Sequence, residues 1–538
     1  MLRKLWNQAS FRYSLLSALI WGLAAHAYAF FHDFFSHDAL NAMVATPVEE
    51  HWKIELGRFL FPLYRTIIRN SLALPWIIGL FTILWAALAL FLLSRIFRLK
   101  SFASIFFAGG ILLINRTVIC LAATYIYELD IDMLSILFAV LAVYLWRCRR
   151  WGFLWGAIPV ALCLGIYQCN LSAVVTLIIF SCVLSLVQEG EQKNQADGAG
   201  TLKRNHHDGT GAFQRILIRG LLSLVMIALG LALYYLLLRI VLSITGIQLV
   251  TNTYNSITNA FLPKNRGFFS LIIGTYRNFF NTLFPAQTSY PRIIITALTA
   301  LILLGTLSLL AQNCFRNRPS AACLILAAFL LLILPLGANT AYILNDGQTH
   351  DLMKYAVWMF FLFPVILAEN KKAPGKKKTP VKKAFLPQAL YVLLFVLLMD
   401  NILTANSLYL KKNLEQHATL SVMTRVFDDI QKTEGYVSGE TPLCFIGVPT
   451  LGGQMPGFGT YYNFTGNWSQ NAIDADTYLY YYHTYAAYTR YYLNQPTAFC
   501  TIEQYNALKA DPLISAAPLW PAQGSIFWQD GVLVIHLS

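Results

Sequence analysis

Long apolar runs, each close to the length that crosses a lipid bilayer, constrain this chain more than any other feature. A transmembrane helix needs about 20 mostly apolar residues, and such runs recur through the first three quarters of the sequence. Of the 538 residues, 57% are hydrophobic and only 12% are charged, whereas soluble proteins carry roughly a quarter charged residues. The sequence therefore predicts a polytopic α-helical membrane protein with about 11 transmembrane helices. We expect these helices near residues 11–31, 72–93, 101–118, 126–146, 152–168, 170–187, 216–243, 292–311, 320–337, 353–369 and 385–405.

The net charge of +14 is explained by where the basic residues lie. Most basic clusters fall in alternate short connections between the expected helices, and cytoplasmic loops carry an excess of Lys and Arg. This pattern predicts an N-terminus inside and, with an odd number of spans, a C-terminus outside. The clusters act as topology markers, so we expect no binding of nucleic acid. They are Arg3, Lys4 and Arg12; Arg95, Arg98 and Lys100; Arg147, Arg149 and Arg150; Arg316 and Arg318; and the basic run from Lys371 to Lys383.

Two domains are expected: a membrane domain over residues 1–405 and a C-terminal extracytoplasmic domain over residues 406–538. The membrane domain carries three external loops, at residues 32–71, 244–291 and 338–352. In the first loop, apolar residues over 50–69 roughly follow a helical period, which predicts one amphipathic helix lying on the outer membrane surface. A second surface helix is expected near 268–284.

The tail loses the long apolar runs and gains turn residues. LEQHATLSVMTRVFDDIQK predicts an amphipathic helix and PLCFIGV a buried strand. Near the end, Asp530 and Gly531 separate two β-prone runs, which is typical of a two-residue hairpin turn. These patterns predict an α/β or α+β domain. Cys444 and Cys500 could form a disulfide there, because an external compartment can be oxidising.

Acidic and basic residues lie in the first external loop, where a simple anchor would need none. Asp33 and Asp38 follow the first span within HDFFSHDAL, placed to stay hydrated while facing a lipid-linked substrate. Residues that flank a span are also often polar simply because they meet water. Further along, Gly57 precedes Arg58, and Arg65 follows about two turns later. Arginine suits bidentate binding of a phosphate, although generic lipid headgroups would also attract it.

Two further groups are expected at external helix ends. Glu128, Asp130 and Asp132 lie in YIYELDIDMLSILFAV, and carboxylates that enter the hydrocarbon usually face a cavity or a partner. Arg116 is a candidate partner, and a structural ion pair is the alternative reading. In NDGQTHDLMKY, His350 and Lys354 are one helical turn apart. They could face a phosphate or sugar together, or His350 could be an ordinary polar residue near a helix start.

The charged positions thus gather on one side of the membrane, and no nucleotide-binding motif accompanies them. An external reaction without a nucleotide needs an activated donor that is already across the membrane. A polyprenyl-phosphate sugar fits, since its head lies at the interface and its tail lies in lipid.

The order of motifs resembles a known family. An acidic first loop, a GR-containing helix, YELDIDMLSILFAVLAVYLW, GIYQCNLSAVV and the terminal PAQGSIFWQDGVLVIHLS are similar to bacterial Gtr-type glucosyltransferases of the GT-C superfamily. The resemblance implies a GT-C-like enzyme of the cytoplasmic (inner or plasma) membrane. It would move a sugar, glucose by the family's default, from undecaprenyl phosphate to a cell-surface polysaccharide on the outer face.

The resemblance also implies roles for residues. The first-loop acid matches Asp38, the glycine-arginine pair matches Gly57 and Arg58, and the acid before the fourth span matches Asp130. This chain has His-Asp where adjacent acids are common, which leaves open whether Asp33 or Asp38 is the base.

We expect a carboxylate, with Asp38 favoured, to take the acceptor's proton and to give inversion. The remaining candidates are Arg58, His350, Lys354, Arg116 and Arg65 for the donor phosphate, Asp130 as a further catalytic carboxylate, and Glu128, Asp132 and Gln168 for the sugar or acceptor. No cofactor is required by the sequence. A divalent cation between carboxylates and phosphate is compatible with it, although no metal motif demands one.

Two other functions would use similar features. A transporter or flippase of polyprenyl-linked glycans also needs many helices and charges facing a cavity, but inverted halves with broken helices are not evident. A polysaccharide polymerase is the third reading, for which we would expect a large arginine-bearing external loop.

Overall fold

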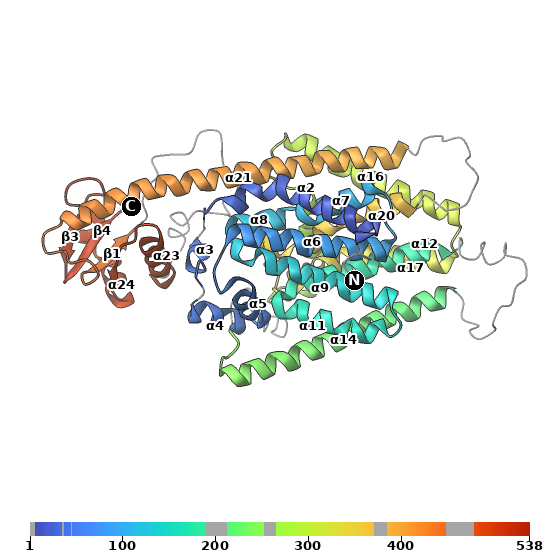
Figure 1. Ribbon diagram of the computed structural model, residues 1–538, viewed down its shortest axis with the longest axis horizontal. Coiled ribbons are helices and arrows are strands. Elements are labelled where there is room, and N and C mark those ends of the chain that lie inside the picture. The colour runs from blue at the N-terminus through green and yellow to red at the C-terminus, as the bar shows by residue number, and fades with distance from the viewer. Residues whose placement is uncertain are drawn as a thin grey trace, which may run out of the picture.

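The computed structural model of the protein is a bundle of long helices with a small mixed sheet at one end (Figure 1). The structure describes residues 6–34, 37–44, 46–189, 212–251, 265–370, 385–447 and 478–537. Within these residues, eight helices are long and apolar enough to cross a membrane. They are α2 (Ala9–Phe31), α6 (Pro75–Phe97), α9 (Leu129–Cys148), α12 (Leu171–Val187), α14 (Ala212–Thr245), α16 (Arg292–Asn317), α17 (Ala321–Ala338) and α21 (Phe385–Lys432).

The other three expected spans are helical but broken or short. α7 (Phe102–Leu113) and α8 (Arg116–Thr124) are bent by 45°. The bend follows from Asn115, whose amide donates to the carbonyl of Ile111 at 3.1 Å while its Oδ1 caps α8, a competition with the backbone that favours a break. The short segments are α10 (Gly152–Trp155) with α11 (Ala157–Ile166), and α19 (Tyr355–Trp358), η5 (Met359–Phe361) and α20 (Leu362–Asn370). The described residues therefore support eight spans, or nine if the bent pair is one, and the expected 11 are not established.

The loop between α2 and α6 differs from the single helix expected over 50–69. It forms α3 (His37–Asn41), α4 (Pro47–Glu55) and α5 (Leu60–Arg69). Gly57 has a φ of 78°, a left-handed conformation that favours glycine. The amide of Arg58 returns to the carbonyl of Lys53 at 2.8 Å, which closes α4 with a glycine-based C-cap. The expectation of one helix was wrong because the helical spacing of apolar residues continues across Gly57, where the helix in fact ends.

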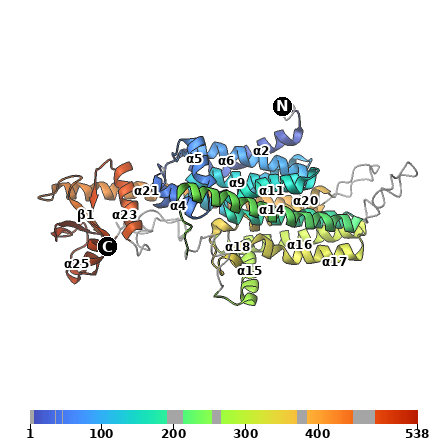
Figure 2. The same ribbon diagram turned by 90° about the horizontal axis from the view of Figure 1, so that it is seen from below.

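The second expected surface helix is present as α15 (Phe268–Leu283). It lies beside α17 and the short α18 (Thr340–Leu344), at one end of the bundle (Figure 2). Leu271, Thr275 and Phe279 form its buried face, while Phe269 and Ile273 are exposed. The helix is thus amphipathic, as its sequence indicates.

α21 continues as one helix from the bundle into the C-terminal region, so the expected boundary at residue 405 falls inside it. The sheet has the order β2-β1-β4-β3. β1 (Pro442–Ile446) pairs in parallel with β2 (Ala498–Phe499) and with β4 (Val532–His536), and β3 (Ile526–Gln529) pairs antiparallel with β4. The helices around it are α23 (Tyr478–Tyr491), α24 (Ile502–Ala510) and α25 (Pro512–Ala516).

Two details of the tail follow from its sequence. The expected hairpin is confirmed, since Asp530 and Gly531 have φ angles of 50° and 74° between β3 and β4, as a two-residue turn of this kind requires. Cys444 on β1 and Cys500, which directly follows β2, are buried neighbours. Both are free thiols in this structure.

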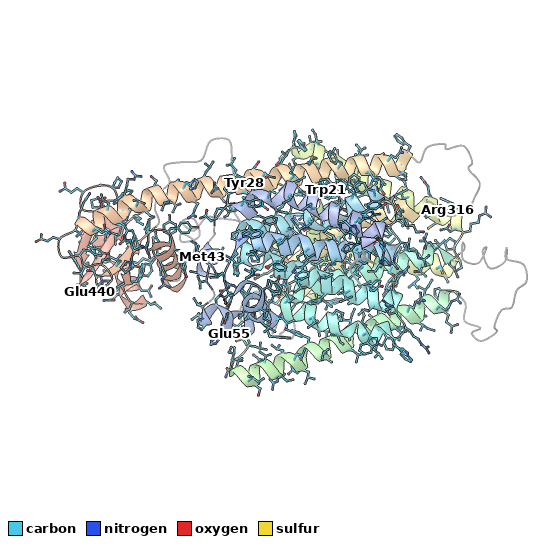
Figure 3. The ribbon with its side chains drawn as sticks, viewed as in Figure 1. Trp21, Tyr28, Met43, Glu55, Arg316 and Glu440 are labelled. Carbon is cyan, nitrogen blue, oxygen red and sulfur yellow. The ribbon has the colours of Figure 1, made fainter. Side chains whose placement is uncertain are left out.

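The C-terminal sheet lies beyond one end of the helix bundle (Figure 1). Figure 3 shows Arg316 at one end, and Glu55 and Met43 at the other, toward the C-terminal sheet and its Glu440. The helices α3, α4 and α5 lie at that second end as well (Figure 1). The segments that carry the expected site residues are therefore on the same side of the bundle as the sheet.

The C-cap at Gly57 gives a first prediction. Replacing Gly57 by Ala should destabilise the protein by about 1–2 kcal/mol, because an L-residue is disfavoured in the left-handed conformation. Gly220 in α14 is a matched control, since a Cβ there would meet no atom within 4 Å. Gly220→Ala should leave the thermal unfolding midpoint of the full chain in detergent unchanged or slightly raised, and equal midpoints for both variants would contradict the role of Gly57.

Candidate active site

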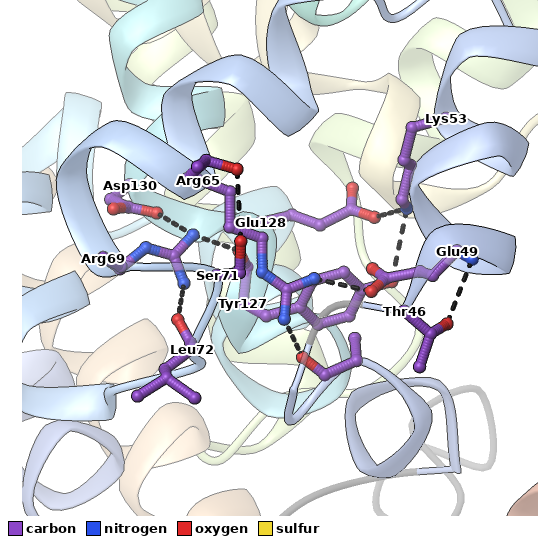
Figure 4. A network of polar contacts seen from close by, with 12 residues as sticks. Thr46, Glu49, Lys53, Arg65, Arg69, Ser71, Leu72, Tyr127, Glu128 and Asp130 are labelled. Carbon is purple, nitrogen blue, oxygen red and sulfur yellow. Dashed lines mark hydrogen bonds and ion pairs between the residues drawn. The ribbon is translucent and has the colours of Figure 1, made fainter.

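Basic side chains from α4 and α5 meet the acidic N-terminal end of α9 (Figure 4). Just before α9, the short helix η1 (Ile126–Glu128) carries Glu128. The ammonium group of Lys53 donates to Glu128, and Nη1 of Arg58 lies 3.6 Å from the other oxygen of the same carboxylate. The guanidinium of Arg58 also lies over the ring of Tyr167, 4.5 Å from its centroid. Glu128 is thus shared by two cations from the first loop.

Asp130 is held by a separate set of partners. Nη2 of Arg69 lies 3.2 Å from its Oδ1, and the hydroxyl of Tyr64 donates to its Oδ2 at 3.0 Å. The same Arg69 nitrogen donates to the carbonyl of Tyr127 at 2.7 Å. Asp130 is 0% exposed. Its contacts therefore join α5 to α9, and no face of this carboxylate is open to solvent.

Arg65 ties the first loop to itself. It donates to Glu49 at 2.6 Å and to the carbonyl of Ala42, and it is only 1% exposed. These contacts link α5 to α4 and to the turn after α3. Arg65, one of the predicted phosphate ligands, thus uses its terminal nitrogens to hold the loop together.

We call these seven charged residues the ion network: Glu49, Lys53, Arg58, Arg65, Arg69, Glu128 and Asp130. Burial raises the pKa of Glu49, with Arg65 and Lys53 opposing the rise. Burial lowers the pKa of Arg69, and Asp130 opposes that change. For Arg58, burial also opposes the charged form, but nearby acids led by Glu128 outweigh it and raise its pKa. The pKa of each of these three groups therefore depends on the charges of its neighbours in the network.

Asp132 follows Asp130 by two residues in α9 and borders a small cavity. The cavity is lined by Asp132, Thr117, Tyr167, Asn170, Leu352 and Tyr355, among others. Asp132 is 7% exposed, and its carboxylate makes no hydrogen bond or ion pair with any residue that the structure describes. It interacts electrostatically with Arg58. A buried carboxylate without such a partner is a marker of a functional position.

The segment with His350 and Lys354 reaches the same cavity. The short helix η4 (Asp351–Met353) contributes Leu352 to the cavity wall, and Tyr355 follows it. The hydroxyl of Thr117 donates to the carbonyl of Asp351 at 2.6 Å, and Lys354 donates to the carboxylate of Asp351 at 2.8 Å. Burial lowers the pKa of His350. Two motifs more than 200 residues apart in the chain are thus brought together.

Two other candidates are engaged elsewhere. Nη2 of Arg116 lies 3.5 Å from the buried carboxylate of Asp400 on α21. Among the described residues, Arg116 thus pairs with Asp400 and not with Glu128, Asp130 or Asp132. Gln168 donates to the carbonyl of Leu56 at 2.9 Å and to the hydroxyl of Tyr234 at 3.1 Å. Gln168 therefore supports the connection between α4 and α5.

The two first-loop acids lie in the segment that joins α2 to α3. Asp33 is exposed, and its backbone carbonyl accepts a hydrogen bond from Tyr492 at 2.6 Å. Asp38 is in α3, which packs against α8, but its side chain is outside the part that the structure describes. The backbone thus carries Asp38 next to the helix whose residues Thr117 and Val118 line the cavity.

Sequence reasoning missed four members of this arrangement: Glu49, Lys53, Tyr64 and Arg69. A signal was present, because Arg65 and Arg69 are four residues apart and so share a helix face. Reading both as buried would have required knowing that this face meets α9. Among the described residues, no group of three or more His, Cys, Asp or Glu side chains is placed to hold a metal ion.

The buried pair of Arg69 and Asp130 gives the second prediction. Arg69→Met should cost about 3–5 kcal/mol of stability, because it leaves a buried carboxylate without its cation. Lys432→Met is the control, since Lys432 forms an exposed pair with Asp428 and exposed pairs contribute little. Thermal unfolding of the full chain in detergent measures both, and a similar effect of the two changes would argue against the assigned role of Arg69.

The chain was compared with known proteins. The family model described as Glucosyl transferase GtrII matches residues 27–368, which is more than half of the chain and includes the ion network and the cavity. No curated protein and no solved structure matches the sequence. On the extent of the family match, the chain belongs to the GtrII glucosyl transferase family.

Proposed function

We propose that this glucosyltransferase moves glucose from a polyprenyl-phosphate donor to a cell-surface polysaccharide on the outer face of the cytoplasmic membrane. The observation that carries the proposal is the cavity bordered by Asp132, whose carboxylate makes no hydrogen bond or ion pair with any described residue and interacts electrostatically with Arg58. A carboxylate suits hydrogen bonds from sugar hydroxyls, and a guanidinium suits a phosphate. A sugar phosphate presents both groups to one site.

The topology of the proposal rests on the two ends of the bundle. α3, α4, α5 and the C-terminal sheet lie at one end, and the helix ends that flank residues 371–384 lie at the other (Figure 1). The basic run in that segment favours the cytoplasm. The ion network, the cavity and the C-terminal domain, here taken as residues 406–538, would then face the extracytoplasmic side, with the N-terminus inside.

Arg58 is our first choice for the donor phosphate. Its contact with Glu128 is 3.6 Å, longer than the 2.6 Å hydrogen bond from Arg65 to Glu49. Both terminal nitrogens of Arg65 donate hydrogen bonds, whereas the guanidinium of Arg58 donates none to the described residues. Arg58 therefore keeps donor capacity that Arg65 has used. His350 and Lys354 flank Leu352, which lines the cavity, and together with Arg58 they would stabilise the charge of the leaving polyprenyl phosphate.

Asp38 is the proposed general base, with Asp33 as the alternative. The acceptor hydroxyl would lose its proton to the carboxylate as its oxygen bonds to the anomeric carbon. At the same time the bond from that carbon to the phosphate oxygen would break, and polyprenyl phosphate would leave. Attack opposite the leaving group inverts the anomeric configuration. Asp132 would orient the sugar, while Asp130, Arg65 and Gln168 would hold the elements that form the site.

A direct assay separates this function from the alternatives. The purified protein is mixed with polyprenyl-phosphate glucose and an acceptor glycan, and release of polyprenyl phosphate is followed. A transferase releases polyprenyl phosphate and gives a glucosylated glycan. A flippase would move the donor across vesicles without cleaving it, and a polymerase would lengthen a polyprenyl-linked glycan.

The assigned base gives the third prediction. Asp38→Asn should lower the turnover number by about 100-fold to 10,000-fold, because a carboxamide cannot accept the proton. Asp33→Asn, the matched control, should retain most of the activity. Turnover at saturating donor and acceptor checks this, and the opposite ranking of the two variants would assign the base to Asp33.

The cavity carboxylate gives the fourth prediction. Asp132→Asn keeps the shape of the side chain but removes a charged acceptor, which contributes about 1.5–3 kcal/mol per hydrogen bond. We therefore expect kcat/KM for the sugar donor to fall by about 10-fold to 150-fold. Affinity for sugar-free polyprenyl phosphate should not change, because Arg58 is assigned to the phosphate. A loss of that affinity as large as the loss in kcat/KM would show that Asp132 does not act on the sugar.

A further inference from the structure

The C-terminal domain contacts the loop that carries the candidate base. Tyr492, which follows α23, donates its hydroxyl to the backbone carbonyl of Asp33 at 2.6 Å. α23 itself packs against α3. Burial and the nearby Asp33 raise the pKa of Tyr492, so the hydroxyl remains a donor. The ring of Tyr492 is stacked on Tyr488 with 5.2 Å between centroids, which fixes its direction.

The same loop is held on its other side by the bundle. Phe34, the neighbour of Asp33, is buried, and its ring stacks on Tyr409 of α21 with 5.8 Å between centroids. Tyr409 in turn has its hydroxyl 2.7 Å from Nδ1 of His26 in α2. Residues 33 and 34 are thus held between a transmembrane helix and the C-terminal domain.

α21 connects these two supports as a single helix. It carries Tyr409 in its middle and Phe427 near its end, and Phe427 packs against Phe445 of β1 with 6.1 Å between ring centroids. The C-terminal sheet is therefore attached to the helix that also supports Phe34. A displacement of the sheet relative to the bundle would have to bend α21 or break the contact of Tyr492.

We propose that Tyr492 is a positioning residue through which the C-terminal domain holds the loop of Asp38 against α8. The consequence for catalysis rests on the proposed function. The hydrogen bond fixes the backbone five residues before Asp38, and α3 packs on the helix that forms one wall of the cavity. Small displacements of a catalytic group have large effects on rate. The C-terminal domain would thus act on turnover without contacting the sugar.

The test compares Tyr492→Phe with Tyr491→Phe in the full chain. Tyr491 is a partly buried neighbour, and its hydroxyl makes no hydrogen bond within the described residues. Hydrogen–deuterium exchange of residues 33–41 should be about fivefold faster in Tyr492→Phe and unchanged in Tyr491→Phe, as expected for the loss of one hydrogen bond. The turnover number should fall by a similar factor, with the KM for the donor unchanged.

The outcomes separate this inference from the proposed function. Equal exchange in the two variants would overturn it, as would faster exchange with wild-type turnover. A fall in donor affinity in place of turnover would also overturn it, since a loop that bears only the base does not bind the donor. If the wild-type protein releases no polyprenyl phosphate, the proposed function fails, while the exchange comparison still decides whether Tyr492 holds the loop.

Discussion

Carboxylates buried where a membrane helix begins are the constraint on which the rest of the site depends. Glu128, Asp130 and Asp132 lie within one turn at the N-terminal end of α9, in a region with little water to solvate them. A charge in such a place is stable only with a partner or a polar cavity. The chain supplies partners from the first loop, and this need explains why α4 and α5 pack onto the bundle and do not simply lie on its surface.

The energetics of such pairs favour specificity over stability. A buried ion pair loses the hydration of both charges, so its net contribution is small, whereas removal of one partner is costly. The ion network therefore selects one arrangement of α4, α5 and α9 by penalising the others. Glu128, just before α9, pairs with Lys53 and Arg58, whereas Asp130 in α9 pairs with Arg69. These separate ion pairs fix both the angle and the register of the loop.

Features that depend on local periodicity and composition were predictable from the sequence. The apolar runs indicated where the helices lie, and the Asp530–Gly531 turn indicated the final hairpin, because both signals are contained within short windows. Three results were not predicted from the periodicity. The break at Asn115 and the division of the first-loop helix at Gly57 arise from local capping hydrogen bonds within otherwise apolar patterns. The contact of Arg65 with Glu49 depends on how α5 packs against α4. For the site, sequence reasoning found the acids and Arg58 but not Lys53 or Arg69, since a basic residue on an external helix looks the same whether it faces lipid headgroups or a buried acid.

The acids at the start of α9 differ in their surroundings, and this difference allows one motif to serve both the fold and the proposed chemistry. Asp130 is enclosed by Arg69 and Tyr64, while Asp132, two residues later, borders a cavity without a direct partner among the described residues. Holding the first acid rigidly fixes the helix, and a fixed helix holds the second acid at the cavity wall. Burial of the Asp132 carboxylate is opposed by desolvation and favoured by the charge of Arg58, and in the proposed function a sugar hydroxyl would add a further partner. Electrostatic preorganisation of the proposed site requires that the charges stay in place before the substrate arrives, and the enclosed pair of Arg69 and Asp130, two residues before Asp132, meets that requirement.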